Sequence, residues 1–391
     1  MSNPLRSVEE IFVRLNSPLP QAQPEQLAAI ARVRGMQPCA GELAAVLEIG
    51  CGSGSNLLPL AERYPRGRLL GLDVSPSKIA AAQRAAAEAG LGNVEFRCAP
   101  IASIAGESFD YIIAPDVYSW IDEATRDALL VLCQRNLAPQ GMAYVNYNAN
   151  PGWRLHDVMG ALMRFEARGA TTAAGQLAAG RNLLEFARAT LPTGDDGYGA
   201  LVVATAESIL RQPDAALIRN YLQGPSHAEY YPEFEARARR HELQVLGDAG
   251  VGIRVTDFLS AADERRLESL TDDPAEKERM RDIVHNTAHR QSVLCRADVP
   301  LDFALGAWRL RNLYLEGRIE TKDRPVSIDT TDSSTFVSHD GYSMTTAVPS
   351  VKAAITHLGS RWPRRIEFAA LVAYVGERAA AAGLPLSAQD V

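Results

Sequence analysis

The sequence has no long apolar run, few cysteines and no excess of positive charge. Its five cysteines are widely spaced and odd in number, so neither a disulfide framework nor a paired metal-binding motif organises the chain. The formal net charge of -7 argues against a chain-wide basic surface for nucleic acid. No apolar stretch approaches the roughly 20 residues that span a bilayer, and residues 1–10 lack the apolar stretch of a signal peptide. We therefore expect a cytoplasmic protein with no nucleic-acid partner and no membrane span.

Apolar residues are abundant, and they follow alternating strand and helix patterns. They make up 47 % of the 391 residues, which suits two domains and a smaller third element. The predicted strands are residues 44–49, 68–74, 94–97, 109–114 and 142–148, with residues 243–246 and 291–296 as later additions. Strands that alternate with helices imply a mainly parallel sheet with helices on both faces.

Local signals place the helices between these strands. Ser75 and Pro76 predict a helix start, and Gly90 predicts its end. Residues 24–35 predict an N-terminal helix, which serves either as simple packing or as a lid over a ligand. Residues 155–222 are rich in alanine, leucine and arginine and predict several helices, so they are expected to form a helical insertion.

A glycine-rich turn follows the first predicted strand. Glycines recur at every second position, at Gly50, Gly52 and Gly54, and a helix comes next. Glycine lets the backbone adopt positive φ and pass close to a ligand. The N-terminus of the following helix offers free N–H groups. Alone, such a turn would serve NAD, FAD or no ligand at all.

Two acidic residues make the prediction more specific. Asp73 ends the second strand, where its carboxylate can accept hydrogen bonds from both ribose hydroxyls of an adenosine. Glu48 lies inside an apolar strand, where a charge is costly and a partner is expected. The sulfonium and amino groups of S-adenosyl-L-methionine are cationic and suit such a carboxylate. The alternatives are a helix-capping Asp73 and a salt-bridged Glu48.

The pattern Glu-x-Gly-x-Gly-x-Gly with a later Asp resembles the first motifs of class I methyltransferases. A closer resemblance, to methyltransferases that carry a methyltransferase regulatory domain, lies in segments Phe109–Ile113, Val117–Trp120 and Asn136–Val145, continuing to Trp153. That family includes the rickettsial-type protein-lysine methyltransferases that act on outer-membrane proteins. The resemblance implies S-adenosyl-L-methionine as cofactor and a protein lysine as acceptor. This chain departs from the family pattern at Pro115-Asp116, where a His-Gly pair is expected.

We therefore expect an α/β fold: a Rossmann-like class I methyltransferase sheet with a helical insertion and a smaller C-terminal α+β domain. The predicted organisation is an N-terminal helical segment or lid (1–40), an S-adenosylmethionine-binding domain (41–154), a helical insertion (155–225), a completion of the sheet with charged helices (226–299) and a C-terminal regulatory-type domain (300–391). The helical insertion is expected to form a dimer contact or a substrate lid, so a homodimer is one predicted state.

Candidate acceptor residues follow the fourth strand, because ligands bind outside the carboxyl ends of parallel strands. Asp116 is a candidate to orient or deprotonate an amine. Tyr118 and Trp120 are candidates to line the site and favour a cation through their aromatic faces. The alternatives are that both aromatic rings belong to the core and that Asp116 caps a loop or helix.

Further candidates lie near the same edge of the sheet. A backbone group of Ala99 is expected to recognise the adenine, because no acidic residue follows the third strand. Tyr147, Asn148 and Trp153 are predicted to line the acceptor pocket, and His156 is a candidate base if its helix faces the site. His285 and His289 are four residues apart on a predicted helix, but no cysteine or carboxylate is spaced to complete a metal site, so none is predicted.

Three functions fit these observations. The first is methyl transfer to a nitrogen, with a protein lysine as the acceptor that the resemblance implies. The second is a small-molecule or peptide N-, O- or S-methyltransferase of a metabolic or natural-product pathway. The third is a non-catalytic regulatory protein that retains the fold, against which the intact glycines and Asp73 argue. A dehydrogenase is disfavoured because the three glycines are spaced two apart.

Overall fold

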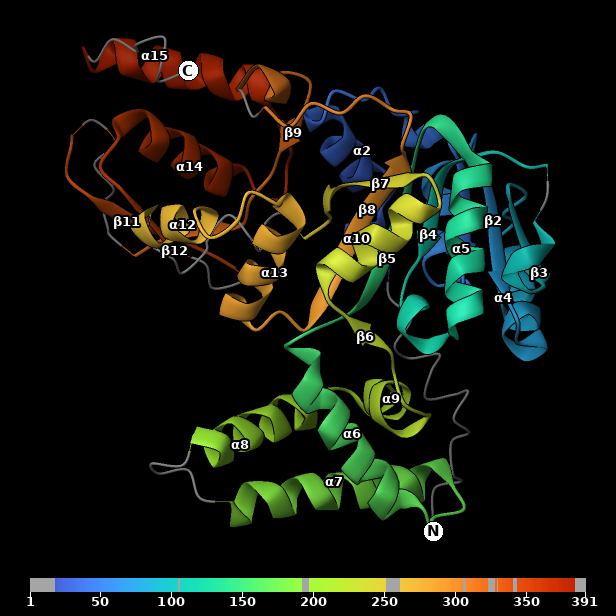
Figure 1. Ribbon diagram of the computed structural model, residues 1–391. Helices are drawn as coiled ribbons and strands as arrows, with labels where there is room; N and C mark the ends of the chain where they lie inside the picture. Colours follow the sequence, from blue (N-terminus) through green and yellow to red (C-terminus); the bar gives the residue numbers. More distant parts are fainter. Residues whose placement is uncertain are drawn as a thin grey trace. The chain divides into compact units, whose positions relative to one another are not determined.

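A mixed β-sheet organises the larger of the two units into which contacts divide the chain (Figure 1). The computed structural model describes residues 18–104, 106–191, 197–250, 261–304, 307–322, 328, 330–339 and 343–383. The larger unit contains the described residues up to 31, then 37–250 and 261–300; the smaller contains 32–36 and those from 301 onward. Residues 1–17 of the predicted N-terminal segment lie outside the described residues.

The sheet has the strand order β3-β2-β1-β4-β5-β8-β7, with β6 pairing the end of β5. The first five strands run parallel, whereas β8 is antiparallel to both β5 and β7. The strands are β1 Ala45–Ile49, β2 Arg68–Asp73, β3 Val94–Cys98, β4 Phe109–Ala114, β5 Leu137–Ala149, β6 Ala228–Glu229, β7 Leu243–Asp248 and β8 His289–Arg296. This topology confirms the predicted Rossmann-like class I fold.

Helices cover the sheet where the sequence signals place them. Ser75 caps α4, its Oγ accepting the Lys78 N–H at 3.4 Å, and Asp122 caps α5 by accepting the Thr125 N–H at 2.8 Å. Outside the helical insertion and the smaller unit, the helices are α2 Pro24–Val33, α3 Leu57–Arg63, α4 Pro76–Glu88, α5 Glu123–Asn136, α10 Tyr231–Arg240, α12 Ala261–Glu268 and α13 Pro274–His285, with a short 3-10 helix η4 Tyr118–Trp120. The charged helices expected within residues 226–299 are α12 and α13.

Alternation along the strands builds the main core. One face of the sheet contributes Leu47, Ile112 and Val145, which pack against Leu129 of α5 and Phe234 of α10 in a single buried cluster. Because successive strand residues point to opposite faces, Glu48 and Asn146 lie on the other face. The polar residues of the central strands thus share the face opposite α5 and α10.

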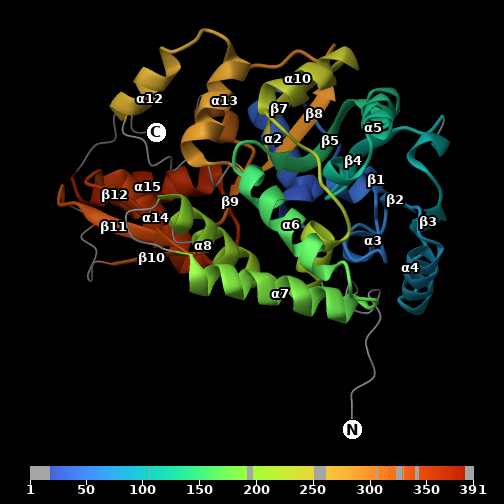
Figure 2. The same cartoon turned by 60° about the horizontal axis from the view of Figure 1, so that its bottom comes forward.

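The predicted helical insertion is present at the carboxyl end of β5, as a group of helices that pack side by side (Figures 1 and 2). Its members are α6 Trp153–Ala167, α7 Ala173–Thr190, α8 Gly197–Leu210, α9 Asp214–Leu217 and a π-helix, η5 Ile218–Leu222. They enclose their own core, which includes Trp153, Met163, Leu184 and Tyr221. β6 follows this insertion and returns the chain to β5.

The smaller unit is α+β, as predicted, with three-stranded and two-stranded antiparallel sheets beside two helices. Its elements are a 3-10 helix η6 Ala307–Leu310, β9 Tyr314–Leu315, β10 Ile319–Thr321, β11 Ser334–Ser338, β12 Ser343–Thr346, α14 Pro349–Arg361, β13 Ile366–Glu367 and α15 Phe368–Ala381. Lys352 of α14 is fully buried and donates to the carbonyl oxygens of Thr330 (2.6 Å) and Asp332 (2.9 Å). In neither unit is any described helix both long and apolar enough to cross a membrane.

Arg290 of β8 is buried and joins the sheet to α13 through an ion pair. Its guanidinium donates to Asp282 at 2.8 Å and to Glu278 at 2.9 Å, and it lies over the Tyr231 ring.

We predict that Asp282→Asn lowers the free energy of unfolding by about 3 kcal/mol, because it leaves the buried Arg290 cation only partly paired. Urea denaturation measures the change. Glu42→Gln, which breaks an exposed pair with Arg66, should change it by less than about 1 kcal/mol, and equal effects would contradict the prediction.

Candidate active site

The glycine turn after β1 leaves room for a ligand to pass its backbone. Gly50, Gly52 and Gly54 all have positive φ, at 72°, 56° and 82°. A Cβ atom on Gly52 would meet no heavy atom within 4 Å, whereas one on Gly50 would lie 2.6 Å from Cγ2 of Val117. The turn is therefore open at Gly52 and, at Gly50, packs directly against the loop that follows β4.

Asp73 lies beside this turn at the carboxyl end of β2. Its Oδ2 accepts the Gly52 N–H at 2.9 Å, and its Oδ1 accepts the Ser75 N–H at 2.9 Å. Each oxygen has a second lone pair for a further donor, as two ribose hydroxyls require. The N-cap of α4 is Ser75, so Asp73 is not needed as its capping residue.

Glu48 is a buried carboxyl group that lacks an ion pair. It is 3 % exposed, and its carboxylate accepts a hydrogen bond from the Asn56 amide at 3.4 Å. Burial raises the pKa of Glu48 to about 8, and the negative charge of Asp73 adds to this. No cation among the described residues pairs with it, contrary to the salt-bridge alternative. A buried acid beside an open glycine turn is suited to a cationic ligand.

Val74 is an exposed apolar residue beside Asp73 that was not singled out from the sequence. It follows Asp73 directly and is 73 % exposed, the largest exposed fraction among the large hydrophobic residues of the described chain. An aliphatic surface beside a ribose-binding carboxylate suits an adenine ring. The N–H of Ala99 donates to the Asp73 carbonyl at 3.1 Å, so this N–H is already used. Only the Ala99 carbonyl remains for the predicted adenine contact. Together these residues fit S-adenosylmethionine.

Asp116 lies two residues beyond β4 and is held in a strained conformation. Its φ of 52° is rare for a non-glycine residue. The Asn146 side chain accepts the Asp116 N–H at 2.5 Å and donates to its Oδ1 at 2.7 Å. Arg219 of η5 forms an ion pair with Oδ2 at 2.8 Å. Neither Asn146 nor Arg219 was predicted, because each reaches Asp116 from a distant part of the sequence.

Two of the predicted aromatic residues belong to the core. Tyr118 and Tyr147 are buried and pack around Phe234 of α10, with ring centroids 5.4 Å and 4.3 Å from that ring. They lie on the α5 and α10 face of the sheet, opposite Asn146. For Tyr118 the core alternative therefore holds, and Tyr147 does not line the acceptor site as predicted. Trp120, at the end of η4, is half-buried.

Trp153 and His156 belong to the core of the helical insertion. Trp153 is 1 % exposed and stacks on His156 with centroids 4.8 Å apart. The Gln212 amide donates to the Tyr221 hydroxyl at 3.2 Å, so that hydroxyl is free to donate to Nδ1 of His156 at 2.9 Å. Burial lowers the pKa of His156 to about 4. This nitrogen is therefore already occupied, which argues against His156 as the base.

His289 is the imidazole best placed at the site. It begins β8, opposite Asn148 of β5, while His285 ends α13, so the two are not on one helix. Its ring meets the edge of Trp153 at 4.8 Å and retains exposed surface. Although His289 keeps exposed surface, the protein packed around its ring desolvates it and lowers its pKa; the Asp116 carboxylate opposes this effect and the Arg219 guanidinium adds to it. The lowered pKa favours the neutral imidazole, which is the form that can accept a proton.

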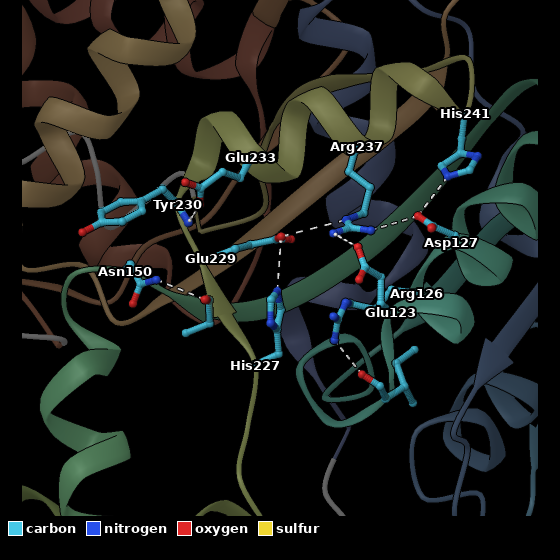
Figure 3. A network of polar contacts seen from close by, with 12 residues as sticks. Glu123, Arg126, Asp127, Asn150, His227, Glu229, Tyr230, Glu233, Arg237 and His241 are labelled. Carbon is cyan, nitrogen blue, oxygen red and sulfur yellow. Dashed lines mark hydrogen bonds and ion pairs between the residues drawn. The ribbon is translucent and has the colours of Figure 1, made fainter.

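A polar network around β6 fixes the segment that follows η5 (Figure 3). Glu229 of β6 is buried between His227, at 3.3 Å, and Arg237 of α10, at 4.0 Å. Arg237 also pairs with Asp127 of α5 at 3.0 Å. The His227 N–H donates to the Ser119 carbonyl at 2.7 Å, so the network also holds the loop that carries Asp116.

Two family models match the chain. A model described as "Methyltransferase domain" matches residues 46–141, which contain the glycine turn, Asp73 and Asp116. A model described as "Predicted methyltransferase regulatory domain" matches residues 213–296, which contain Arg219 and His289. This second match lies before residues 300–391, where the sequence analysis expected the regulatory-type domain.

Two proteins of Rickettsia prowazekii are among the similar sequences. Uncharacterized protein RP028 is 30% identical over 226 residues, which are 57% of this chain and 90% of that protein. Uncharacterized protein RP789 is 31% identical over 283 residues, which are 71% of this chain and 51% of that protein, so the chain spans about half its length. The trans-aconitate 2-methyltransferase of Methylobacterium nodulans is 35% identical over 137 residues, which are 34% of this chain and 50% of that protein.

Solved structures show the same fold. PKMT2 from Rickettsia typhi superimposes with a TM-score of 0.82 at 24% identity, over 93% of this chain and 71% of that protein. The structure of the same protein in complex with AdoHcy gives a TM-score of 0.83 over the same shares.

Glu48 provides a test of cofactor binding. Because its carboxyl is protonated near pH 7, pairing with a cationic ligand should release about one proton at that pH. Affinity for S-adenosylmethionine should therefore rise with pH until the pKa of about 8 is passed. Calorimetry in two buffers of different ionisation enthalpy measures the release. Glu48→Gln should abolish it, whereas Glu62→Gln, at an exposed position, should not. Equal release from all three proteins would rule out this role.

Proposed function

This chain belongs to the S-adenosylmethionine-dependent methyltransferases that carry a methyltransferase regulatory domain, and on that premise we propose that it methylates an amine nitrogen, namely that of a protein lysine side chain. The observation that carries the proposal is the position of Asp116. Its loop packs against Gly50 of the cofactor turn, and its carboxylate lies at the carboxyl edge of the sheet. A fixed carboxylate there suits an acceptor that arrives as a cation.

The side chains around Asp116 supply what amine methylation requires of a protein. The bound cofactor would supply an electrophilic methyl group on a sulfonium. Asp116 would hold the acceptor ammonium in line, and neutral His289 would accept the proton that the nitrogen must lose. Removal from water and the positive charge of Arg219 both favour that loss. The predicted lysine acceptor is further supported by the sequence resemblance to protein-lysine methyltransferases.

Arg219 supports a second candidate function. A half-buried guanidinium near the acceptor position also suits a small acid, because arginine binds carboxylates through paired hydrogen bonds. Trans-aconitate 2-methyltransferase, similar to one third of this chain, is named for such an acid. A small-molecule acceptor methylated on oxygen, nitrogen or sulfur is therefore the alternative.

Labelling separates these two functions. The purified protein would be incubated with methyl-labelled S-adenosylmethionine and lysate from its own source, and the products separated by size. Label in protein that is stable to base and is lost with Asp73→Ala supports lysine methylation. Label confined to small molecules contradicts it and supports the alternative.

Asp116 should affect acceptor use more than cofactor use. We predict that Asp116→Asn lowers kcat/KM for the acceptor by about 100-fold, within the range of a positioned charged group in catalysis. The Kd for S-adenosylhomocysteine should stay within about twofold. Steady-state kinetics and calorimetry provide the two values. Asp272→Asn, at an exposed position between α12 and α13, is the matched control. An unchanged kcat/KM in Asp116→Asn would remove this residue from the mechanism.

His289 should produce the acidic limb of the pH–rate profile. Its lowered pKa means that the neutral form, which accepts a proton, is present near pH 7 and disappears as pH falls through that pKa. Activity should therefore rise with pH below 6.5, the ordinary pKa of histidine, and level off above it. In His289→Gln we expect lower kcat and no such limb. Survival of the limb in this variant would assign it to another group.

A further inference from the structure

The segment that matches the regulatory-domain model contributes side chains to the acceptor site. Arg219 comes from η5, and His289 and Gln291 come from β8, all within residues 213–296. The residues predicted to bind the cofactor all precede residue 100. Arg219 lies in a π-helix, a geometry found frequently at functional sites. The acceptor position is thus built from two different parts of the chain.

The two oxygens of Asp116 have separate partners. Oδ1 accepts the Asn146 amide at 2.7 Å, and the Asp116 N–H donates back to Asn146 at 2.5 Å. These two bonds fix the backbone and the carboxylate, so Arg219 is not needed to orient the group. Arg219 pairs instead with Oδ2 at 2.8 Å. Oδ2 is therefore the oxygen that an acceptor cation would use.

The sheet face beside this ion pair is polar. Asn146 is opposite Gln291 across the β5–β8 pair, and Asn148 is opposite His289, so the four side chains share a face. Two of their buried atoms, Nδ2 of Asn148 and Oε1 of Gln291, have no hydrogen-bond partner among the described residues. Unpaired buried donors and acceptors are costly. This face is therefore suited to a polar ligand rather than to an apolar one.

We propose that Arg219 is a specificity-determining residue, because its guanidinium occupies the oxygen of Asp116 that an acceptor cation needs. An acceptor binds productively only if its own positive charge replaces that of Arg219 beside Oδ2. A primary ammonium can do this, whereas an alcohol or a thioether lacks the charge. The inference rests on the proposed function, since it takes the acceptor to be an amine.

Equilibrium binding of a simple amine tests the competition without methyl transfer. The probe is n-butylammonium, added to the full chain saturated with S-adenosylhomocysteine. Arg219→Gln should lower the Kd for the probe about two- to fivefold, because the free energy of the half-exposed ion pair that the probe must break corresponds to about that factor. Arg219→Lys keeps a competing cation and should remain near the wild-type value. Arg211→Gln, an exposed arginine of the same insertion, should leave the Kd unchanged and controls for net charge.

Asp116→Asn makes the test decisive. If Arg219 acts by occupying Asp116, then Arg219→Gln should have no effect on the Kd in an Asp116→Asn background. The inference is overturned if Arg219→Gln weakens amine binding, if it strengthens it equally without Asp116, or if neither wild type nor Arg219→Gln binds the amine.

The imidazole resonances of His289 give an independent readout that also confirms folding. Arg219 is one cause of the lowered pKa of His289, so this pKa should rise in Arg219→Gln and stay unchanged in Arg211→Gln. An unchanged pKa in both would show that Arg219 does not occupy this site. The variants could change amine binding as expected while no methylated amine product forms. That result would contradict the proposed function but would support the role of Arg219 in amine binding.

Discussion

The two hydrogen bonds between Asn146 and Asp116 are the interaction on which the site depends. They join the loop after β4 to β5 and hold Asp116 at a φ of 52°, a conformation that costs free energy without such support. That loop packs against Gly50, so the position of the acceptor carboxylate is tied to the position of the cofactor turn. Asp116 also forms an ion pair with Arg219, and this contact links the helical insertion to the sheet.

Local sequence signals sufficed for the central strands of the sheet, for α4 and for the glycine turn. The strand-to-glycine transition, the Ser75 cap and the acidic residue ending β2 all act over a few residues, so they could be interpreted without the fold. Asn146, Arg219 and His289 could not be identified in this way, because strand register and the η5 turn bring them to Asp116. The sequence also left open whether Tyr118 lines the site or belongs to the core, because only the observed packing around Phe234 shows which side of the sheet Tyr118 and Tyr147 are on.

Charge distinguishes the two halves of the site. The cofactor half has Glu48 and Asp73, which carry no basic partner among the described residues and so suit a cationic ligand. In the acceptor half the carboxylate of Asp116 already has a cation beside it. A fixed cation in this half makes the choice of acceptor depend on competition as well as on shape. The segment that matches the regulatory-domain model thus supplies the cation beside Asp116.

A crystal structure with S-adenosylhomocysteine would test the central claim most directly, through the distance from the ligand sulfur to Oδ2 of Asp116. An acceptor nitrogen would be hydrogen-bonded to this oxygen at about 3 Å, and the transferred methyl would lie about 3 Å from that nitrogen. This arrangement requires the sulfur to lie roughly 6–8 Å from Oδ2. We expect the sulfur in that range, facing Asp116 across open space. A sulfur that is more distant, or separated from Asp116 by protein side chains, would contradict the placement of the acceptor site.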